Sequence, residues 1–158
     1  MSQILAIDPG PTDSAYVLMA GEKILKFAKC DNALLCDAIM TKLIEPGALV
    51  IEKIASYGMP VGQEVFETVF WSGRFAQANY AHLAHVYRIT RKEVVTALCG
   101  SSKANDASVR QALIDRYGGK EKAIGKKKAP GPLYGVTKDV WSALAVAIVW
   151  QDRRAGGK

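Results

Sequence analysis

Histidine, cysteine and long apolar runs are all scarce in this chain of 158 residues. With only His82 and His85 present, a histidine-based zinc site or a serine–histidine–aspartate triad has little support. Cys30, Cys36 and Cys99 lack the C-x-x-C spacing of a metal site, and their odd number favours reduced thiols. No apolar stretch approaches the ~20 residues that span a bilayer. We therefore expect a soluble, cytoplasmic protein with no membrane partner.

Positive charge is concentrated in the second part of the chain. Lys and Arg number 21 against 15 Asp and Glu, which gives a formal charge of +6. Residues 1–87 contain 6 basic and 9 acidic side chains, whereas residues 88–158 contain 15 basic and 6 acidic ones. Surplus lysines that only aid solubility are the alternative, and charge alone does not decide. The asymmetry favours a surface that binds a polyanion.

Length and a hydrophobic content of 49% fit one globular domain over residues 1–158. Apolar runs bounded by turn residues predict an α/β domain with five strands, over 3–8, 14–19, 23–29, 48–52 and 86–90. Helical periodicity predicts helices over 32–44, 63–82, 92–98, 107–117 and 137–150.

The predicted helices have candidate caps, and the last two are separated by a long polar segment. Asn32 and Thr137 are the expected caps of the first and last helices, and Asn105 or Asp106 caps the helix over 107–117. Residues 118–135 are rich in Gly, Lys and Pro, which predicts a mobile basic loop.

Asp8 and Glu52 each end an apolar run that predicts a buried strand. The helix between these runs supplies the crossover that makes the two strands parallel. If the strands are adjacent, the two acids lie at one edge of the sheet, with the strands about 4.8 Å apart. Carboxylates bind Mg²⁺ or Mn²⁺, and two such ions ~3.5–4 Å apart cleave phosphodiesters without a nucleophilic side chain. The alternative is that Asp8 is a turn residue and Glu52 a surface residue.

An ordered set of motifs, spanning nearly the whole chain, resembles the RuvC Holliday junction resolvases. The matching segments are Ile7–Gly10, Val50–Lys53, Ser72–Phe75, Cys99–Lys103 and Asp139–Ala145. They correspond in order to the first strand's acid, the second acid, the long helix, a basic segment and the last helix. Chain length, the segment over 106–118 and the ending Trp-Ser-Ala-Leu-Ala look closest to the RuvC-like resolvases of bacteriophages.

The resemblance implies a ribonuclease H-like fold, with a five-stranded mixed sheet flanked by helices, and a metal-dependent endonuclease that cuts Holliday junctions and related branched DNA. Asp8, Glu52 and Asp139 are the implied catalytic residues and ligands of Mg²⁺ or Mn²⁺, with two ions per site. Cellular RuvC enzymes carry a second acid where this chain has Ser142, three residues after Asp139 and on the same helix face. Asp106 is the competing fourth acid, although its position suits a helix cap. A bacteriophage protein would act in the host cytoplasm.

The resemblance also implies a homodimer, because a four-way junction has near-twofold symmetry. The helix over 63–82 is the expected interface, since Phe66, Phe70, Trp71 and Phe75 are many aromatics for one buried stripe. Its alternative is a helix packed wholly within the monomer.

Six residues are candidate DNA contacts. Tyr57 follows Glu52 in a loop where the family places an aromatic that disturbs base stacking, and a packed loop tyrosine is the alternative. Candidates for phosphate contacts, which position DNA without specifying sequence, are Lys103, Arg110, Lys126, Lys127 and Lys128.

Two other functions are compatible with parts of the sequence. Asp8-Pro-Gly-Pro-Thr12 also fits the Asp-x-Gly-x-Thr phosphate loop of the actin and sugar-kinase ATPases, but those enzymes need two domains around the nucleotide. A non-catalytic junction-binding protein on the same fold is the second alternative, which the number of acids disfavours.

Overall fold

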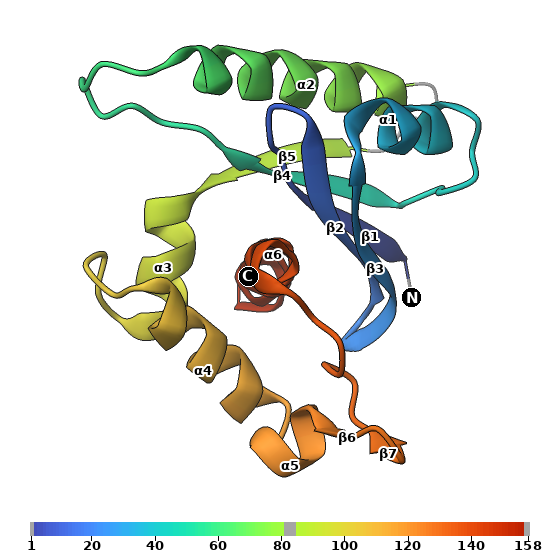
Figure 1. Ribbon diagram of the computed structural model, residues 1–158, viewed down its shortest axis with the longest axis vertical. Helices are drawn as coiled ribbons and strands as arrows, with labels where there is room; N and C mark the ends of the chain where they lie inside the picture. Colours follow the sequence, from blue (N-terminus) through green and yellow to red (C-terminus); the bar gives the residue numbers. More distant parts are fainter. Residues whose placement is uncertain (1, 81–84, 157–158) are drawn as a thin grey trace.

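A mixed five-stranded sheet forms the centre of the computed structural model, which describes residues 2–80 and 85–156 (Figure 1). Its strands are β1 (Gln3–Asp8), β2 (Asp13–Ala20), β3 (Lys23–Asp31), β4 (Ala48–Lys53) and β5 (His85–Thr90), in the order β3-β2-β1-β4-β5. The first three strands form an antiparallel meander, and β4 runs parallel to both β1 and β5. All five predicted strands are confirmed.

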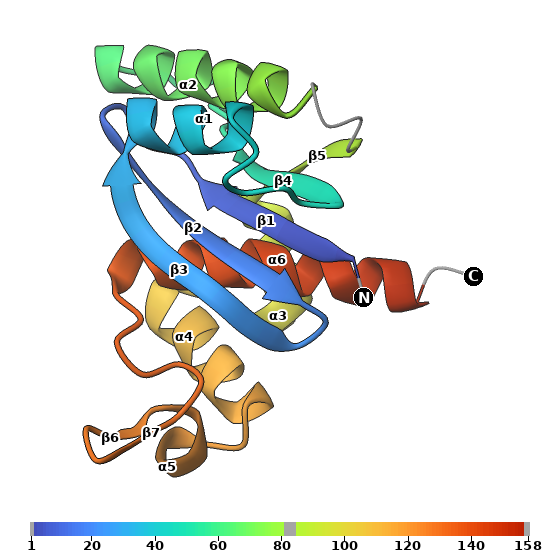
Figure 2. The ribbon, with the colours of Figure 1, turned by 90° about the vertical axis from the view of Figure 1, so that its right-hand side faces the viewer.

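Helices cover both faces of this sheet (Figure 2). α1 (Asn32–Met40) and α2 (Gln63–Tyr80) lie on one face, and α6 (Lys138–Gly156) lies on the other. α3 (Arg91–Cys99) and α4 (Asp106–Arg116) pack outside α6, followed by the short helix α5 (Lys120–Ala123). The predicted helix over 63–82 is confirmed as far as Tyr80; its remainder, with His82, lies outside the described residues.

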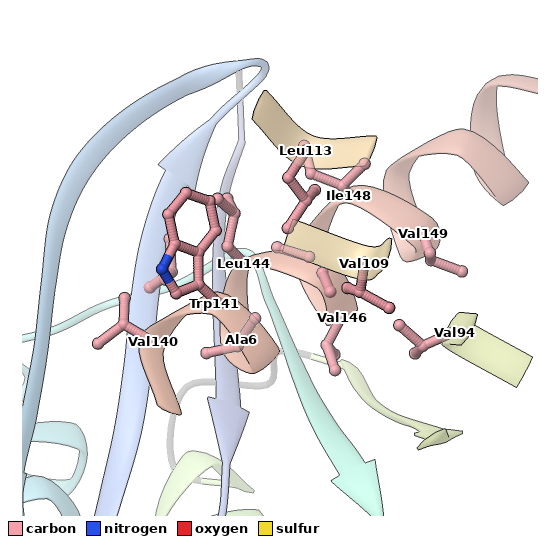
Figure 3. Packing of buried hydrophobic residues seen from close by; sticks show 14 of the residues in the cluster. Ala6, Val94, Val109, Leu113, Val140, Trp141, Leu144, Val146, Ile148 and Val149 are labelled. Atoms are coloured by element: carbon pink, nitrogen blue, oxygen red, sulfur yellow. The ribbon is translucent and has the colours of Figure 1, made fainter. Parts of the chain in front are cut away.

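Side-chain alternation along β1 explains why this strand is apolar throughout. Leu5 and Ile7 pack towards α1 and α2, whereas Ile4 and Ala6 pack towards α6, because successive side chains point to opposite faces. The α6 side is shown in Figure 3, where Ala6 lies near Leu144 of that helix. Three alanines in the middle of α6 are fully buried between the sheet and the outer helices, namely Ala143, Ala145 and Ala147. Their small side chains allow the neighbouring elements to pack closely against α6.

The ends of two helices differ from the prediction. α1 ends at Met40 rather than near residue 44, and its cap is Asp31, whose carboxylate accepts the backbone N–H groups of Ala33 and Leu34. Asn32 is therefore the first helical residue and not the cap. α6 continues to Gly156, beyond the predicted end near residue 150.

The segment over 118–135 has more regular structure than an irregular loop. It contains α5 and a two-stranded hairpin formed by β6 (Gly125–Lys126) and β7 (Ala129–Pro130). Leu133 is buried and donates its N–H to the carbonyl oxygen of Ala123, which ties the hairpin back to α5. The Gly- and Pro-rich composition correctly predicted turns in this segment. One buried leucine, Leu133, was too weak a sequence pattern to predict that the hairpin is anchored to α5.

None of the helices within the described ranges combines the length and apolarity that crossing a bilayer requires.

Candidate metal centre

Asp8 and Glu52 lie side by side at the carboxyl ends of β1 and β4. Ile7 pairs with Ile51 in the parallel ladder, so the residue that follows each of them reaches the same edge of the sheet. Glu52 is buried, with 8% of its surface exposed, and Asp8 is partly buried. The expectation that the two acids lie at one edge of the sheet is therefore confirmed.

The two carboxyl groups share a hydrogen bond in a buried environment. Burial, followed by the nearby Glu52 carboxylate, raises the pKa of Asp8 to about 8. Burial also raises the pKa of Glu52, although the Arg91 charge and the hydrogen bond from Asp8 oppose that rise. Without a metal ion, Asp8 therefore retains its proton at neutral pH. Two adjacent buried carboxyl groups that must retain a proton form an all-oxygen donor set that fits a hard divalent cation.

Asp139 reaches the same region from the first turn of α6. Figure 2 shows the start of α6 on the same side of the molecule as the end of β1. Asp139 and Asp8 line one cavity of about 200 Å³, together with Lys29 of β3. Lys29 Nζ lies 2.5 Å from Asp139 Oδ2. Among the described residues, no three acidic, histidine or cysteine side chains already converge on one ion position. The third predicted ligand thus lines the site while its carboxylate pairs with Lys29.

A buried polar network holds the turn that follows Asp8. Asn32 Nδ2 donates to the carbonyl oxygen of Gly10 at 2.8 Å, and Ser14 Oγ donates to Asn32 Oδ1 at 2.5 Å. Gly10 N–H in turn donates to Ser14 Oγ. A Cβ on Gly10 would lie 2.2 Å from the Asp13 carbonyl oxygen, so only glycine fits. The sequence predicted that Asn32 caps the helix. Asp31 and Asn32 are both good capping residues, so one of them was available for another role, and the structure shows that Asn32 is that residue.

Arg91 is a second residue that the sequence analysis missed. It follows Thr90, the last residue of β5, and β5 is the strand next to β4. Its charge reaches the acid pair and partly opposes the rise that burial causes in the pKa values of Asp8 and Glu52. Its Nη2 donates to Asp106 Oδ1, and its buried Nη1 has no hydrogen-bond partner among the described residues.

Asp106 is held by Arg91 and does not cap α4. Asn105 is the cap, because its Oδ1 accepts the backbone N–H of Ser108. The choice left open between Asn105 and Asp106 is thereby decided, and the capping role suggested for Asp106 is wrong.

A larger cavity of about 640 Å³ adjoins the acids through Asp139. Arg110 and Ser142 line it, and the Arg110 guanidinium lies 5.2 Å from the centre of the Trp141 ring. Ser142 and Asp139 therefore face a common space, as their spacing predicted. Of the proposed DNA contacts, Arg110 is thus placed beside the acidic site.

The other proposed DNA contacts lie elsewhere on the surface. Tyr57, in the loop after β4, is 62% exposed, and Lys92 Nζ lies 5.8 Å from the centre of its ring. Lys103 is exposed between α3 and α4. The exposed hairpin lysines, Lys126, Lys127 and Lys128, lie at the end of the molecule opposite α2 (Figures 1 and 2).

Comparison with known proteins found similarity at the level of structure. No family model and no curated protein matches the sequence. The structure of Thermus thermophilus RuvC matches with a TM-score of 0.77 and 17% identity, over 98% of this chain and 96% of that one. T. thermophilus RuvC in complex with a Holliday junction substrate matches with a TM-score of 0.73 and 18% identity, over 98% of this chain and 97% of that one. The yeast mitochondrial Holliday junction resolvase Ydc2 matches with a TM-score of 0.64 and 14% identity, over 98% of this chain and 79% of that one. The chain therefore has the ribonuclease H-like α/β fold of RuvC, a five-stranded mixed sheet flanked by helices.

Proposed function

We propose that this protein is a divalent-metal-dependent endonuclease that cleaves four-way DNA junctions and related branched DNA. The observation that carries the proposal is the pair of Asp8 and Glu52 at the carboxyl ends of adjacent parallel strands, with Asp139 lining the cavity that Asp8 also lines. The fold supports it: among the matched structures, one RuvC is described in complex with a Holliday junction substrate, and Ydc2 is described as a Holliday junction resolvase.

The chain's own residues divide into those that hold the cation and those that hold DNA. Asp8, Glu52 and Asp139 would bind Mg²⁺ or Mn²⁺, which supplies Lewis-acid catalysis of phosphodiester hydrolysis. A second ion needs a further oxygen ligand, and Ser142 shares a cavity with Asp139. Arg110 faces that cavity and is suited to a phosphate contact near the acids. A bacteriophage origin and a cytoplasmic location stay predictions from the sequence.

An exposed apolar face on α2 supports a homodimer. Phe66, Val69 and Phe70 are 60%, 52% and 60% exposed, whereas Phe75 is fully buried against the sheet. Three large apolar side chains exposed on one helix favour association. Two copies related by a twofold axis would present two acidic sites to the two strands of a junction.

Metal-dependent nicking of a labelled four-way junction tests the function. Asp8→Asn, Glu52→Gln and Asp139→Asn should each lose at least about a hundredfold in cleavage rate and still bind the junction, because changes in the outer shell alone cost about 10–100-fold. Asp37→Asn, on the exposed side of α1, is the matched control and should cleave normally. Asp106→Asn should keep partial activity. Normal cleavage by any of the three acid variants would remove that residue from the site.

The same assay separates the alternatives. Junction binding by the wild-type protein without nicking in Mg²⁺ or Mn²⁺ would indicate a non-catalytic binding protein. A rise in melting temperature with ATP would instead favour the phosphate-loop ATPase.

A further inference from the structure

Lys29 is placed where a substrate phosphate would meet the acidic site. Within the described part of the chain, the cavity beside Asp8 is lined by the acids Asp8, Asp13 and Asp139, and Lys29 is its only cationic side chain. A phosphodiester that approaches these acids carries the same sign of charge as they do. A cationic side chain on this side of the cavity would add to the attraction of the bound metal ion for the phosphate.

The sheet register puts Lys29 in line with Asp8. Asp8 pairs with Ala15 on β2, and Ala15 pairs with Lys29 on β3. Directly paired residues point to the same face, so the three side chains form one row on the α6 side, spanning roughly 10 Å across three strands. Ala15 is small and lines the cavity, which leaves space between the acid and the lysine.

We propose that Lys29 contacts the phosphate that is cleaved, and that its ion pair with Asp139 is the arrangement of the DNA-free protein. This inference rests on the proposed endonuclease function. It assigns Lys29 as a catalytic residue that stabilises negative charge on the phosphate oxygens, beside the acids that hold the cation.

The energetics of the ion pair permit this exchange of partners. The side chains of Lys29 and Asp139 are 48% and 40% exposed, and exposed ion pairs contribute little to stability because solvent screens them. Lysine carries a point charge on a flexible stem, so it can turn from Asp139 into the cavity without a backbone change. Arg91 is less free to do so because it pairs with Asp106 and is more buried, at 31% exposed.

Single-turnover cleavage of a four-way junction at saturating Mn²⁺ is the test. Lys29→Met should slow cleavage by about a hundredfold, in the range seen when one charge-stabilising donor is removed. Lys29→Arg, which keeps the charge, should retain more activity. Lys26→Met is the matched control, because Lys26 is exposed on the same strand but directed to the opposite face, and it should cleave at the wild-type rate.

A second readout is independent of cleavage. In an Asp8→Asn background, Lys29→Met should reduce the slope of log binding constant against log salt by about one, as expected when the protein neutralises one phosphate fewer. A lysine that only shielded Asp139 would leave this slope unchanged, and its removal would tighten Mn²⁺ binding without slowing cleavage at saturating metal. That result would overturn the inference.

The two proposals fail in different ways. If the wild-type protein nicks no junction, the endonuclease proposal falls and the inference on Lys29 falls with it. If the wild-type protein nicks and Lys29→Met nicks equally fast, only the inference is overturned. Should Lys29→Met fail to fold, as judged by circular dichroism, Lys29→Gln carries the same comparison.

Discussion

Asp8 is a partly buried carboxyl group whose position lowers the stability of the metal-free protein and suits a metal site. Its neighbours along β1 are apolar, and the next strand brings Glu52 against it rather than a cation. The repulsion between the two carboxylates can be removed by a proton or by a divalent ion, and Asp8 retains the proton when no ion is bound. Such strain between like charges is typical of a site built for metal binding.

The stability of the metal-free protein should therefore depend on pH through Asp8. Its pKa is about 8 in the folded state and 3.8 ordinarily, so the folded state holds an extra proton between these values. The raised pKa adds to the free energy of unfolding. This contribution is fully present below about pH 4 and is lost as the pH rises through about 8. Asp8→Asn removes the dependence, so in EDTA the variant should melt higher than the wild-type protein near pH 8.5, and the difference should shrink near about pH 5.

Thermal melts in EDTA at the two pH values make the measurement. Each kcal/mol of difference should appear as about 2–4 °C for a chain of this size. Asp37→Asn, an exposed acid, serves as the control and should follow the wild-type curve. Parallel curves for Asp8→Asn and the wild-type protein would contradict the raised pKa.

At the scale of elements, the hairpin of β6 and β7 presents Lys126, Lys127 and Lys128 on a short, anchored turn. All three side chains are exposed, and the hairpin lies well away from α2 (Figure 1). A four-way junction is larger than the acidic cavity. The lysines of the β6–β7 hairpin could therefore bind a second stretch of the DNA phosphate backbone.

Replacing the three hairpin lysines by Gln should weaken junction binding and flatten its salt dependence. The slope of log binding constant against log salt should fall by up to about 2.7, or 0.9 for each phosphate that the protein no longer neutralises. Fluorescence anisotropy over a salt series measures it. The control replaces Lys23, Lys26 and Lys42, which removes the same charge from the opposite part of the chain. Equal slopes for the two triple variants would exclude the hairpin from the interface.

At the scale of the whole molecule, the α2 face is the feature that an isolated monomer leaves unexplained. The sequence left open whether its aromatics pack within the monomer or against a second copy. The structure divides them: Phe75 is buried, whereas Phe66 and Phe70 are largely exposed. Packing within one chain therefore accounts for only part of the aromatic stripe.

Charged substitutions on this face should convert a dimer to monomers. Phe66→Glu and Phe70→Glu place charge on the proposed interface, and sedimentation velocity should show about half the wild-type mass, with weaker junction binding. Leu43→Glu is the control, because Leu43 is 79% exposed but lies outside α2. A wild-type protein that sediments as a monomer with full cleavage activity would refute the dimer.

Local sequence was sufficient for the sheet and for the first two acids. The five apolar runs became the five strands, and in β1, β2 and β4 burial on both faces accounts for the continuous apolar signal. Asp8 and Glu52 could be paired from their positions at run ends, since the parallel crossover limits where those ends lie.

Only the tertiary structure decided which polar side chains meet across the sheet. Lys29 and Asp139 are 110 residues apart, and their contact depends on the placement of α6 over β3. Arg91 with Asp106, and Asn32 with Gly10, likewise join separate elements. Local patterns report which segments are buried and, to within a residue, where a helix begins, because those effects act over one turn or strand. The partner of a long polar side chain depends on how whole helices and strands pack together. The periodicity of the sequence does not predict that packing.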